Sequence, residues 1–509
     1  MAEQKTLMII IKVITAEEIT SVRAEGGQSL LEILRKKGYN LYAPCGGKGT
    51  CGKCTLMVRG EGEVISCKYY PAKDIEVVLP GETEARILVH QTEYLEEMPF
   101  KARRPEFDGL DVFGVAIDVG TTTLVIYFLN LKTGEIEKVS SFLNPQKAFG
   151  ADIISRINYC QEHEGGLSEL QTVILDSINR QLDGFRKIRE PGSVNFERIV
   201  IVGNTTMLHL LLGEDPVSIA LAPFVPKFTD RQTRKGLSSG LKINNEGEVI
   251  TLPCLSAFVG ADIIAGLSVL KPKFRNYLFL DIGTNGEMAI VKGKEIVACA
   301  TAAGPAFEGA NISCGMAAVN GAVSAFHDPG KYQVIGGSEP AGICGSGIVD
   351  LVAYLLRTGR IDETGRLTEP CIVHSENKIM VTQEDIREIQ LAKSAVFSGI
   401  KILMKITGLT FGDLDALYLA GGFGNYINIR SATDIGLLPR EMEGRIYPVG
   451  NSAGIGALQY LRNQDLEQKI SHILGNIQYV ELSNVDEFAT EFAMNMNFTV
   501  PDTIKKTSI

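Results

Sequence analysis

Two short motifs of the same kind constrain the fold of this chain more than any other feature. Each consists of an apolar run, a turn that begins Asp-x-Gly-Thr, and a second apolar run. The first copy runs from Ala116 to Ile126 and the second from Tyr277 to Val291. This pattern predicts a strand, a tight turn and a second strand. A single Asp-x-Gly turn is common in ordinary hairpins, but two copies a lobe's length apart indicate an internal duplication.

Both turns have the chemistry of a phosphate site with a metal ion. Glycine-rich turns can direct backbone N–H groups toward an anion, so we predict two phosphate loops. Their residues are Gly120, Thr121 and Thr122 in the first copy and Gly283, Thr284, Asn285 and Gly286 in the second. Asp118 and Asp281 end the preceding strands and would face the same anion. Because like charges do not share a site without a cation, we expect Mg²⁺ between them, held through water.

The size and charge of the chain exclude several classes of protein. At 509 residues the chain is too long for one core, and two lobes with one loop each would close on a single nucleotide. The net charge of −10 comes without a basic block, which argues against binding to nucleic acid or an anionic membrane. No apolar run reaches the roughly 18 residues of a membrane span, and the N-terminus lacks a signal-peptide pattern. We therefore expect a cytoplasmic protein without membrane association.

Four of the ten cysteines cluster near the N-terminus, at Cys45, Cys51, Cys54 and Cys67. Three share one glycine-rich loop and the fourth follows a hairpin, in the spacing C-x5-C-x2-C-x12-C. A reducing cytosol argues against disulfides, whereas four thiolates on such a loop are typical of a [2Fe–2S] centre. A four-cysteine zinc site and unligated cysteines are the alternatives, although zinc ribbons prefer two C-x2-C knuckles and the sequence has one.

These motifs divide the chain into three parts. Residues 1–85 are predicted to form a [2Fe–2S] domain that resembles a β-grasp ferredoxin, with Ser29 as the N-cap of a short helix. Residues 86–110 are acidic and broken by prolines, and we interpret them as a linker, either a passive tether or a hinge for the cluster. Residues 111–500 form an α/β domain with lobes at about 111–270, plus C-terminal elements, and about 275–445. We expect residues 479–498 to complete the first lobe.

Five segments, taken with the cysteine-rich domain, resemble one protein family. They are Asp281–Glu287, Gly203–Met207, Ala303–Gly309, Gly342–Gly347 and Ala420–Tyr426. The two Asp-x-Gly-Thr loops and the late Ala-Gly-Gly turn are similar to those of the superfamily of acetate kinase, sugar kinases, heat-shock chaperone ATPases and actin (ASKHA). Within it, the five segments and the N-terminal [2Fe–2S] domain resemble the ATP-dependent reductive activators of corrinoid enzymes. The resemblance implies that Gly421 and Gly422 contact adenosine.

The resemblance implies a β-grasp ferredoxin domain followed by a two-lobed, actin-like ATPase domain, with a [2Fe–2S] cluster, ATP and Mg²⁺ as cofactors. The expected reaction is ATP-dependent transfer of one electron to an inactive Co(II) corrinoid protein, which restores Co(I) in a corrinoid-dependent methyltransferase system. The expected partners are that corrinoid (cobalamin-binding) protein and a low-potential electron donor such as a ferredoxin or a flavin reductase. A homodimer is compatible with the resemblance.

Hydrolysis of ATP also requires a carboxylate that orients the attacking water. Asp262 is our first candidate, because it follows an apolar strand and a glycine, and Asp152 and Glu287 come next. The alternative for Asp262 is a structural role as a helix N-cap before Ile263.

Three other functions compete with corrinoid activation. An ATP-gated electron donor of the 2-hydroxyacyl-CoA dehydratase-activator type has a similar ATPase, but it uses a [4Fe–4S] cluster that bridges a dimer, so the four-cysteine domain argues against it. A small-molecule kinase of the same superfamily would have no need of a cluster. An actin-like or chaperone-like interaction module with a redox sensor would hold a cluster that never passes its electron on.

Overall fold

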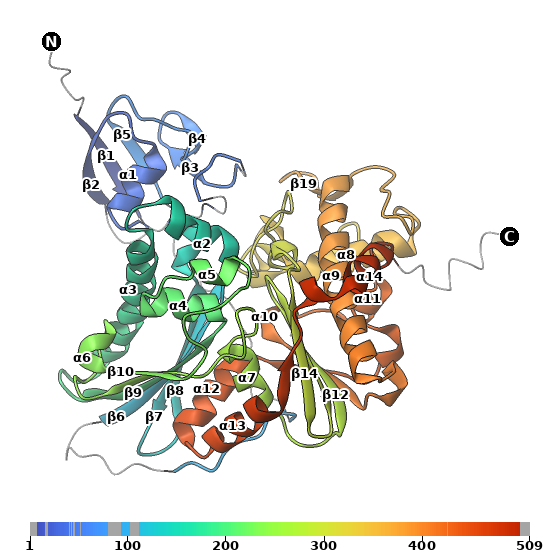
Figure 1. The fold of residues 1–509 in the computed structure, drawn as a ribbon. Coiled ribbons are helices and arrows are strands. Elements are labelled where there is room, and N and C mark those ends of the chain that lie inside the picture. Colours follow the sequence, from blue (N-terminus) through green and yellow to red (C-terminus); the bar gives the residue numbers. More distant parts are fainter. Residues whose placement is uncertain are drawn as a thin grey trace.

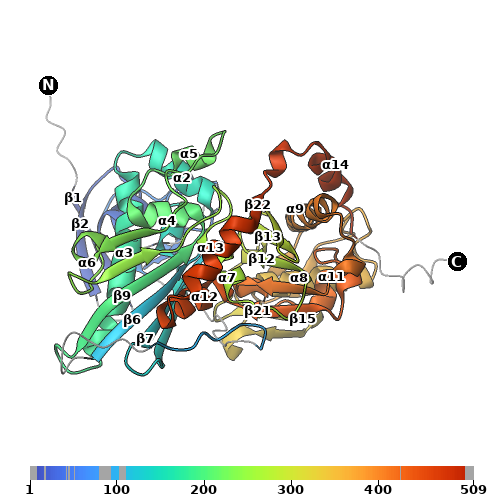
Figure 2. The same cartoon turned by 60° about the horizontal axis from the view of Figure 1, so that its bottom comes forward.

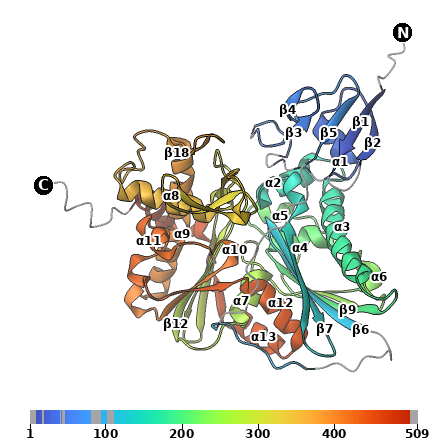
Figure 3. The ribbon, with the colours of Figure 1, turned by 180° about the vertical axis from the view of Figure 1, so that it is seen from behind.

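The computed structural model describes residues 8–15, 19–39, 41, 43, 46–50, 52–79, 93–101, 111–424 and 426–498. These residues form a small N-terminal domain and two larger lobes that stand side by side (Figure 1). The N-terminal domain lies against the α2 end of the first lobe, and Figure 3 shows the same arrangement from behind.

The N-terminal domain is a five-stranded mixed sheet covered by one helix. Its strands are β1 (Met8–Ile14), β2 (Ile19–Glu25), β3 (Thr55–Val58), β4 (Gly62–Ile65) and β5 (Ile75–Val78), in the order β2-β1-β5-β3-β4. β1 and β5 run parallel, and the other neighbouring pairs run antiparallel. Helix α1 (Leu30–Lys36) buries its apolar face in the core of this domain. Its N-cap is Ser29, as predicted, and the Glu32 carboxylate accepts a hydrogen bond from the Ser29 N–H at 2.9 Å.

The first lobe is built on a six-stranded sheet. Its strands are β6 (Asp111–Val119), β7 (Thr123–Asn130), β8 (Ile136–Leu143), β9 (Val194–Gly203), β10 (Gln232–Lys235) and β11 (Glu248–Thr251). Its helices are α2 (Ile153–Glu162), α3 (Gly166–Lys187), α4 (Thr205–Leu212), α5 (Val217–Ala220), α6 (Gly236–Ser239) and α7 (Ala261–Ser268). The long helix α3 is amphipathic, because its buried residues Leu170, Ile174, Ile178 and Leu182 recur every four positions and face the core.

The second lobe is built on another six-stranded sheet with two small sheets beside it. The large sheet contains β12 (Asn276–Ile282), β13 (Gly286–Lys292), β14 (Glu295–Thr301), β20 (Ala416–Ala420), β21 (Ile446–Gly450) and β22 (Ile477–Tyr479). The small sheets contain β15 (Ala322–Asp328), β16 (Lys331–Val334) and β17 (Gly342–Ile343), and β18 (Cys371–His374) and β19 (Ile379–Val381). Its helices include α8 (Gly345–Arg357), α9 (Gln383–Thr407), α10 (Gly421–Gly424) and α11 (Ile429–Asp434).

The two large sheets repeat one topology. In the first sheet, β8, β7 and β6 form an antiparallel meander, and β9 and β11 continue it as parallel strands. In the second sheet, β14, β13 and β12 form the meander, and β20 and β21 continue it in parallel. Asp118 of β6 and Asp281 of β12 therefore occupy equivalent places. The repeated topology agrees with the duplication that the two motifs predict.

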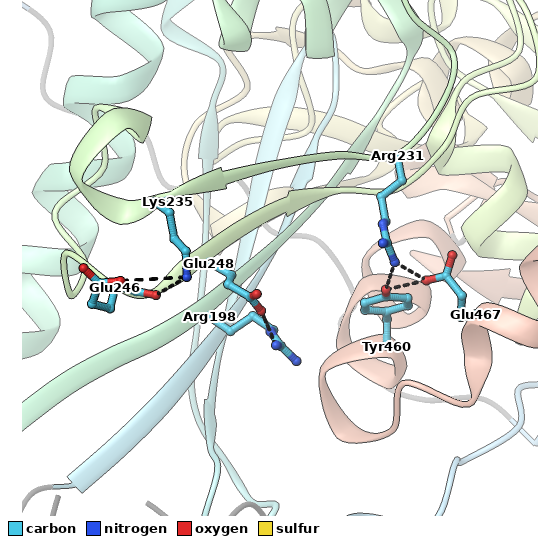
Figure 4. A network of polar contacts seen from close by, with 7 residues as sticks. All are labelled: Arg198, Arg231, Lys235, Glu246, Glu248, Tyr460 and Glu467. Atoms are coloured by element: carbon cyan, nitrogen blue, oxygen red, sulfur yellow. Dashed lines mark hydrogen bonds and ion pairs between the residues drawn. The ribbon is translucent and has the colours of Figure 1, made fainter. Parts of the chain in front are cut away.

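Two helices near the C-terminus return to the first lobe, as the sequence predicts. They are α12 (Ser452–Arg462) and α13 (Leu466–Asn476), and α12 packs on α7 between the two large sheets (Figure 2). A Cβ at Gly456 would lie 2.5 Å from the carbonyl oxygen of Ala265, so this close packing requires glycine. Arg231 fastens both helices to the edge of the first sheet, because it donates to the Tyr460 hydroxyl at 3.1 Å and to the Glu467 carboxylate at 2.9 Å (Figure 4).

The last segment belongs to the second lobe, so the prediction that it completes the first lobe is wrong. β22 pairs in parallel with β14, and α14 (Asp486–Met494) packs on α9. Two side chains of α9, Lys393 and Ser394, donate to the carbonyl groups of Asn497 and Phe492, each at 2.5 Å. The apolar pattern of this segment predicts a strand and a helix, but it does not indicate which sheet edge the strand joins.

Part of the predicted linker, residues 93–101, is packed against both lobes. Leu95 and Met98 are buried in the core of the first lobe. The ring of Tyr94 lies 6.0 Å from that of Tyr418 and 4.6 Å from that of Tyr447, both in the second lobe. These nine residues are therefore fixed, and the interpretation as a passive tether does not hold for them. The other linker residues, 86–92 and 102–110, lie outside the described residues.

Candidate functional site

The two predicted phosphate loops line one cavity between the lobes. Each loop joins two antiparallel strands, β6 to β7 and β12 to β13, so the predicted strand–turn–strand structure is confirmed. The predicted residues in the lining are Asp118, Gly120, Thr121, Thr122, Asp262, Asp281, Gly283, Thr284, Asn285, Glu287, Gly421 and Gly422. Two predicted residues lie elsewhere. Gly286 is part of the β12–β13 ladder, and Asp152 is the N-cap of α2, where it accepts a hydrogen bond from the Ser155 N–H at 2.7 Å.

Carboxylates that are buried or half-buried gather in this cavity. Burial, helped by the charges of Asp262 and Asp281, raises the pKa of Asp118 to about 8. Burial, together with the charges of Asp262 and Glu308, raises the pKa of Asp281 to about 7. Burial raises the pKa of Asp262 to about 6 and also raises the pKa of Glu287, with Asp262 and Asp281 adding to the effect. The protein alone therefore concentrates more negative charge here than it neutralises.

The backbone explains why the carboxylates of the second lobe are so close. Asp281 and Glu287 face each other across the β12–β13 pair, so their side chains point to the same side of the sheet. Gly421 follows β20, the parallel neighbour of β12, and a Cβ there would lie 2.4 Å from Oδ1 of Asp281. Glycine at position 421 thus makes room for the Asp281 carboxylate. The sequence shows the glycine turn but not this reason for it.

The donor set fits a magnesium ion that keeps most of its water. Within the described ranges, no three His, Cys, Asp or Glu side chains are arranged to bind one metal ion directly. Mg²⁺ is usually bound by one or two carboxylates, by waters and by phosphate oxygens rather than by an all-protein cage. Asp118 and Asp281 are suited to hold such a hydrated ion, because a cation would offset the burial and the neighbouring carboxylate charges that raise both pKa values.

The loop geometry narrows the choice of amides that can bind phosphate. The Gly120 N–H donates to the Thr123 carbonyl at 3.0 Å, and the Gly283 N–H donates to the Asn285 carbonyl at 2.9 Å, so both amides close their own turns. Gly286 is paired with Ile282 in the sheet. The amides of Gly120 and Gly283 are therefore used within the fold, and Gly286 lies in the strand ladder. We expect a phosphate to bind the remaining predicted amides, those of Thr121, Thr122, Thr284 and Asn285.

The candidate for orienting water, Asp262, lies at the start of α7 with its side chain in the cavity. The N-cap of α7 is Gly260, so Asp262 is not the N-cap that the alternative reading predicts. Its carboxylate accepts a hydrogen bond from the Ile263 N–H at 2.9 Å. A helix N-terminus favours a negative charge, which makes Asp262 more easily ionised than the two aspartates at the strand ends.

Glu308 is a cavity residue that the sequence analysis did not single out. It ends the 3₁₀ turn Pro305–Glu308, and its carboxylate accepts hydrogen bonds from the hydroxyl groups of Thr122 and Thr284, the second at 2.7 Å. One carboxylate thus holds both phosphate loops. The available signal was the segment Ala303–Gly309, where an acidic residue stands among glycines, but no local pattern connects it with loops so far away in the sequence.

Two buried cations behind the first loop were also missed. Arg156 is fully buried and donates to the Thr121 carbonyl at 2.5 Å, so it supports the loop from the side of α2. Burial lowers the pKa of Lys147 to about 8, while the nearby charge of Glu308 acts in the opposite direction. In the sequence, neither residue differs from an ordinary surface cation.

The carboxylate cluster predicts how stability depends on pH. Because the folded-state pKa values of Asp118 and Asp281 are raised to about 8 and about 7, the folded protein binds protons that the unfolded chain has already lost. The stability of the nucleotide-free protein should therefore fall as the pH rises from 6 to above 8. We expect a lower midpoint of urea unfolding at pH 8.5 than at pH 6, and a smaller difference with Mg-ATP present. Equal midpoints without nucleotide would contradict the raised pKa values.

The cysteine-rich loop has the backbone of a site that wraps around a compact group. Gly46, Gly47, Gly49 and Gly52 all have positive φ, between 67° and 95°, a region that other residues rarely adopt. Cys54 and Cys67 are buried beside this loop, whereas Cys45 and Cys51 lie outside the described residues. The buried hydroxyl of Ser66 has no hydrogen-bond partner within the described part of the chain. A sulfur acceptor next to Cys67 would satisfy it, so the described residues fit an iron–sulfur cluster.

Two models of known protein families match most of this chain. A family model described as the RACo middle region matches residues 113–272, and one described as the C-terminal ASKHA domain of RACo matches residues 275–507. The two matches meet where the first lobe passes into the second. Among the described residues, no helix is both long and apolar enough to cross a membrane.

Three individual proteins resemble this chain. The corrinoid activation enzyme RamQ of Eubacterium limosum is 30% identical, over 91% of this chain and 94% of its own length. The [Co(II) methylated amine-specific corrinoid protein] reductase of Methanosarcina barkeri is 25% identical, over 67% of this chain and 68% of its own. The solved structure of a reductive activator for corrinoid, iron-sulfur protein is 29% identical, with a TM-score of 0.69, over 96% of this chain and 98% of that one.

Proposed function

The chain belongs to the RACo family of corrinoid activators, and from this membership we propose that it is an ATP-hydrolysing reductive activator of a corrinoid protein. The proposed reaction adds one electron to the Co(II) centre of an inactive corrinoid protein and so yields Co(I), at the expense of ATP. The observation that carries the proposal is that one chain joins a cysteine-rich loop to a two-loop cavity lined with carboxylates. The cysteine-rich loop is suited to carry an electron, and the cavity is suited to bind a Mg-nucleotide.

The N-terminal domain has the role of electron carrier in this proposal. Its mixed sheet, single covering helix and glycine-rich loop support a β-grasp ferredoxin domain. Cys45, Cys51, Cys54 and Cys67 would hold the [2Fe–2S] cluster, which supplies one electron at a time. Two of these cysteines, Cys54 and Cys67, are buried beside the glycine-rich loop. Cysteines stay reduced in the cytosol, which agrees with the proposed cytoplasmic location. The proposed electron donor is a low-potential protein such as a ferredoxin or a flavin reductase.

The cavity between the lobes has the role of ATPase site. Asp118 and Asp281 would hold Mg²⁺ through water, and Gly421 and Gly422 would lie at adenosine. Asp262 is proposed to orient the attacking water, because it lines the cavity at the start of α7, where the helix N-terminus and the Ile263 N–H favour its ionised form. An ionised carboxylate can accept a proton from water as the bond to the γ-phosphate forms.

The proposal predicts that reduction of the corrinoid requires ATP. The pre-reduced protein should be mixed anaerobically with a purified Co(II) corrinoid methyl-transfer protein, with and without Mg-ATP, while the absorbance of Co(I) is followed. We expect a Co(I) band that grows only with Mg-ATP, because the reduction is uphill from ordinary donors. Co(I) formed equally well without nucleotide would contradict the coupling. ATP consumed without Co(I) in any corrinoid protein tested would favour the kinase alternative, and metabolites would then be screened for phosphorylation.

A further inference from the structure

We propose that the turn carrying Glu308 senses the nucleotide and passes the signal to the cysteine-rich loop through Lys53. The coupling segment is residues 305–315, and it touches the two phosphate loops at one end and the N-terminal domain at the other. This inference rests on the proposed function and deepens it, because it describes how the ATPase site could act on the electron carrier. Its test needs neither a corrinoid protein nor an electron.

The sensing end is the Glu308 carboxylate. It accepts hydrogen bonds from the hydroxyl groups of Thr122 and Thr284, which belong to different lobes. A nucleotide phosphate is also an anionic acceptor and would compete for the same two hydroxyl groups. Since the phosphate and the carboxylate repel each other, both cannot occupy this place. Mg-nucleotide would therefore displace Glu308 from the loops.

The transmitting end is a contact with Lys53. The ammonium group of Lys53 donates to the carbonyl oxygen of Ile312 at 2.9 Å and to that of Gly309 at 3.4 Å. Lys53 stands directly before Cys54 in the cysteine-rich loop, and Gly309 directly follows Glu308. Hydrogen bonds from a charged donor are stronger than those between neutral groups. A shift of Glu308 would thus move the acceptors that hold Lys53.

The segment between these ends is tightly packed. A Cβ at Gly309 would lie 2.2 Å from the carbonyl oxygen of Met316, and a Cβ at Gly315 would lie 2.3 Å from the carbonyl oxygen of Gly309. The Ser313 N–H donates to the Asp385 carboxylate at 2.7 Å, which ties the segment to α9. Such tight packing leaves little room for the backbone to absorb a displacement locally. The displacement of Glu308 therefore reaches Gly309 and Ile312.

The N-terminal domain also contacts the first lobe, so it connects the two lobes. The Lys48 ammonium lies 3.0 Å from the Glu162 carboxylate of α2. The Arg35 guanidinium lies 5.0 Å from the centre of the Phe149 ring, also in the first lobe. Figures 1 and 3 both show this domain over α2, with its β3 side turned toward the second lobe. When the Lys53 contact is lost, the cysteine-rich loop would leave the second lobe and become accessible to a partner.

The test measures hydrogen–deuterium exchange of the holoprotein by mass spectrometry, in peptides that cover the cysteine-rich loop and the coupling segment. Wild type and Lys53→Met are compared with and without Mg²⁺ and a non-hydrolysable ATP analogue. Lys73→Met is the matched control, because Lys73 is an exposed lysine of the same domain that pairs with Glu61 within that domain, at 2.9 Å.

We expect the analogue to raise exchange of the wild-type loop about tenfold, the effect of losing one charge-assisted hydrogen bond. Lys53→Met should show that faster exchange already without nucleotide and no further change with it, while Lys73→Met should behave like wild type. The proposed coupling would be overturned if the analogue did not change the exchange rate of the wild-type loop. It would also be overturned if the loop of Lys53→Met exchanged at the wild-type rate with and without the analogue. Failure to form Co(I) in a protein that passes this test would count only against the proposed function.

Discussion

Replacement of Asp281 by asparagine is expected to lower the rate of ATP hydrolysis about a thousandfold and, at the same time, to stabilise the nucleotide-free protein at pH 8. The rate falls because the amide would no longer hold Mg²⁺, and a metal ion supplies several kcal/mol of stabilisation to the developing charge. The stability rises because burial and neighbouring carboxylates penalise ionised Asp281, whose pKa is raised to about 7. Steady-state phosphate release and urea unfolding at pH 8 measure the two effects.

The variant Asp152→Asn is a matched control for Asp281→Asn, because it makes the same chemical change outside the cavity. Asp152 was also a candidate for the water-orienting role, but in the structure it caps α2. Asparagine is as good an N-cap as aspartate, so Asp152→Asn should keep both ATP hydrolysis and stability near wild type. An Asp281→Asn protein that hydrolyses ATP normally would refute the assignment of the metal site. One that is inactive but less stable at pH 8 would refute the account of the carboxylate cluster.

Replacement of Cys54 by serine is expected to abolish electron transfer while leaving ATP hydrolysis within about twofold of wild type, because Cys54 does not line the ATPase cavity. The serine hydroxyl is a poor ligand for iron, and Cys54 is buried beside the loop where a cluster would sit. The variant should therefore lose the visible absorption of the cluster and its ability to form Co(I). Absorbance, iron content and phosphate release can be measured on one preparation.

Cys160→Ser is the control for this experiment, because Cys160 is a half-buried cysteine of α2 outside the predicted ligand set. It should keep the absorption and the activity. Wild-type protein that contains zinc and shows no visible band would support the zinc alternative. Cys54→Ser protein that still reduces Co(II) would rule out the proposed ligand set.

The strand–turn–strand structure of the two loops could be predicted because all the information is local. Strand, turn and strand lie within about a dozen consecutive residues, and the apolar periodicity and glycines of that stretch determine its backbone. The same reasoning explains why Ser29 could be predicted as the N-cap of α1, since its capping partner Glu32 lies three positions away. The duplication could be predicted as well, since the sequence contains the motif twice and the two sheets repeat the same order of strands.

Glu308 could not be predicted in the same way. Its partners Thr122 and Thr284 are 186 and 24 positions away in the sequence, and only the closed fold brings the three together. The buried cations Lys147 and Arg156 were missed for a related reason. A buried charge is recognised by what surrounds it, and those surroundings come from distant segments.

The errors on the last segment and on the linker also come from tertiary packing. The strand Ile477–Tyr479 has no feature that selects one sheet edge over another. In the linker, the apolar residues Leu95 and Met98 stand among acidic ones, which made the segment look solvated. The acidic side chains of Glu96 and Glu97 in fact pair with Lys469 and Arg462 on the C-terminal helices, at 2.5 and 2.9 Å.

The packed linker segment changes where this protein can be divided. Residues 93–101 cover apolar surface on both lobes, so the packed unit that contains the ATPase cavity begins near residue 93 rather than at β6. A chimaera joined at residue 111 would leave Tyr418 and Tyr447 without the ring of Tyr94, whereas one joined just before residue 93 would keep that surface closed. Exchange of the electron-carrying module between relatives, in evolution or in the laboratory, should therefore succeed at the earlier junction and fail at the later one.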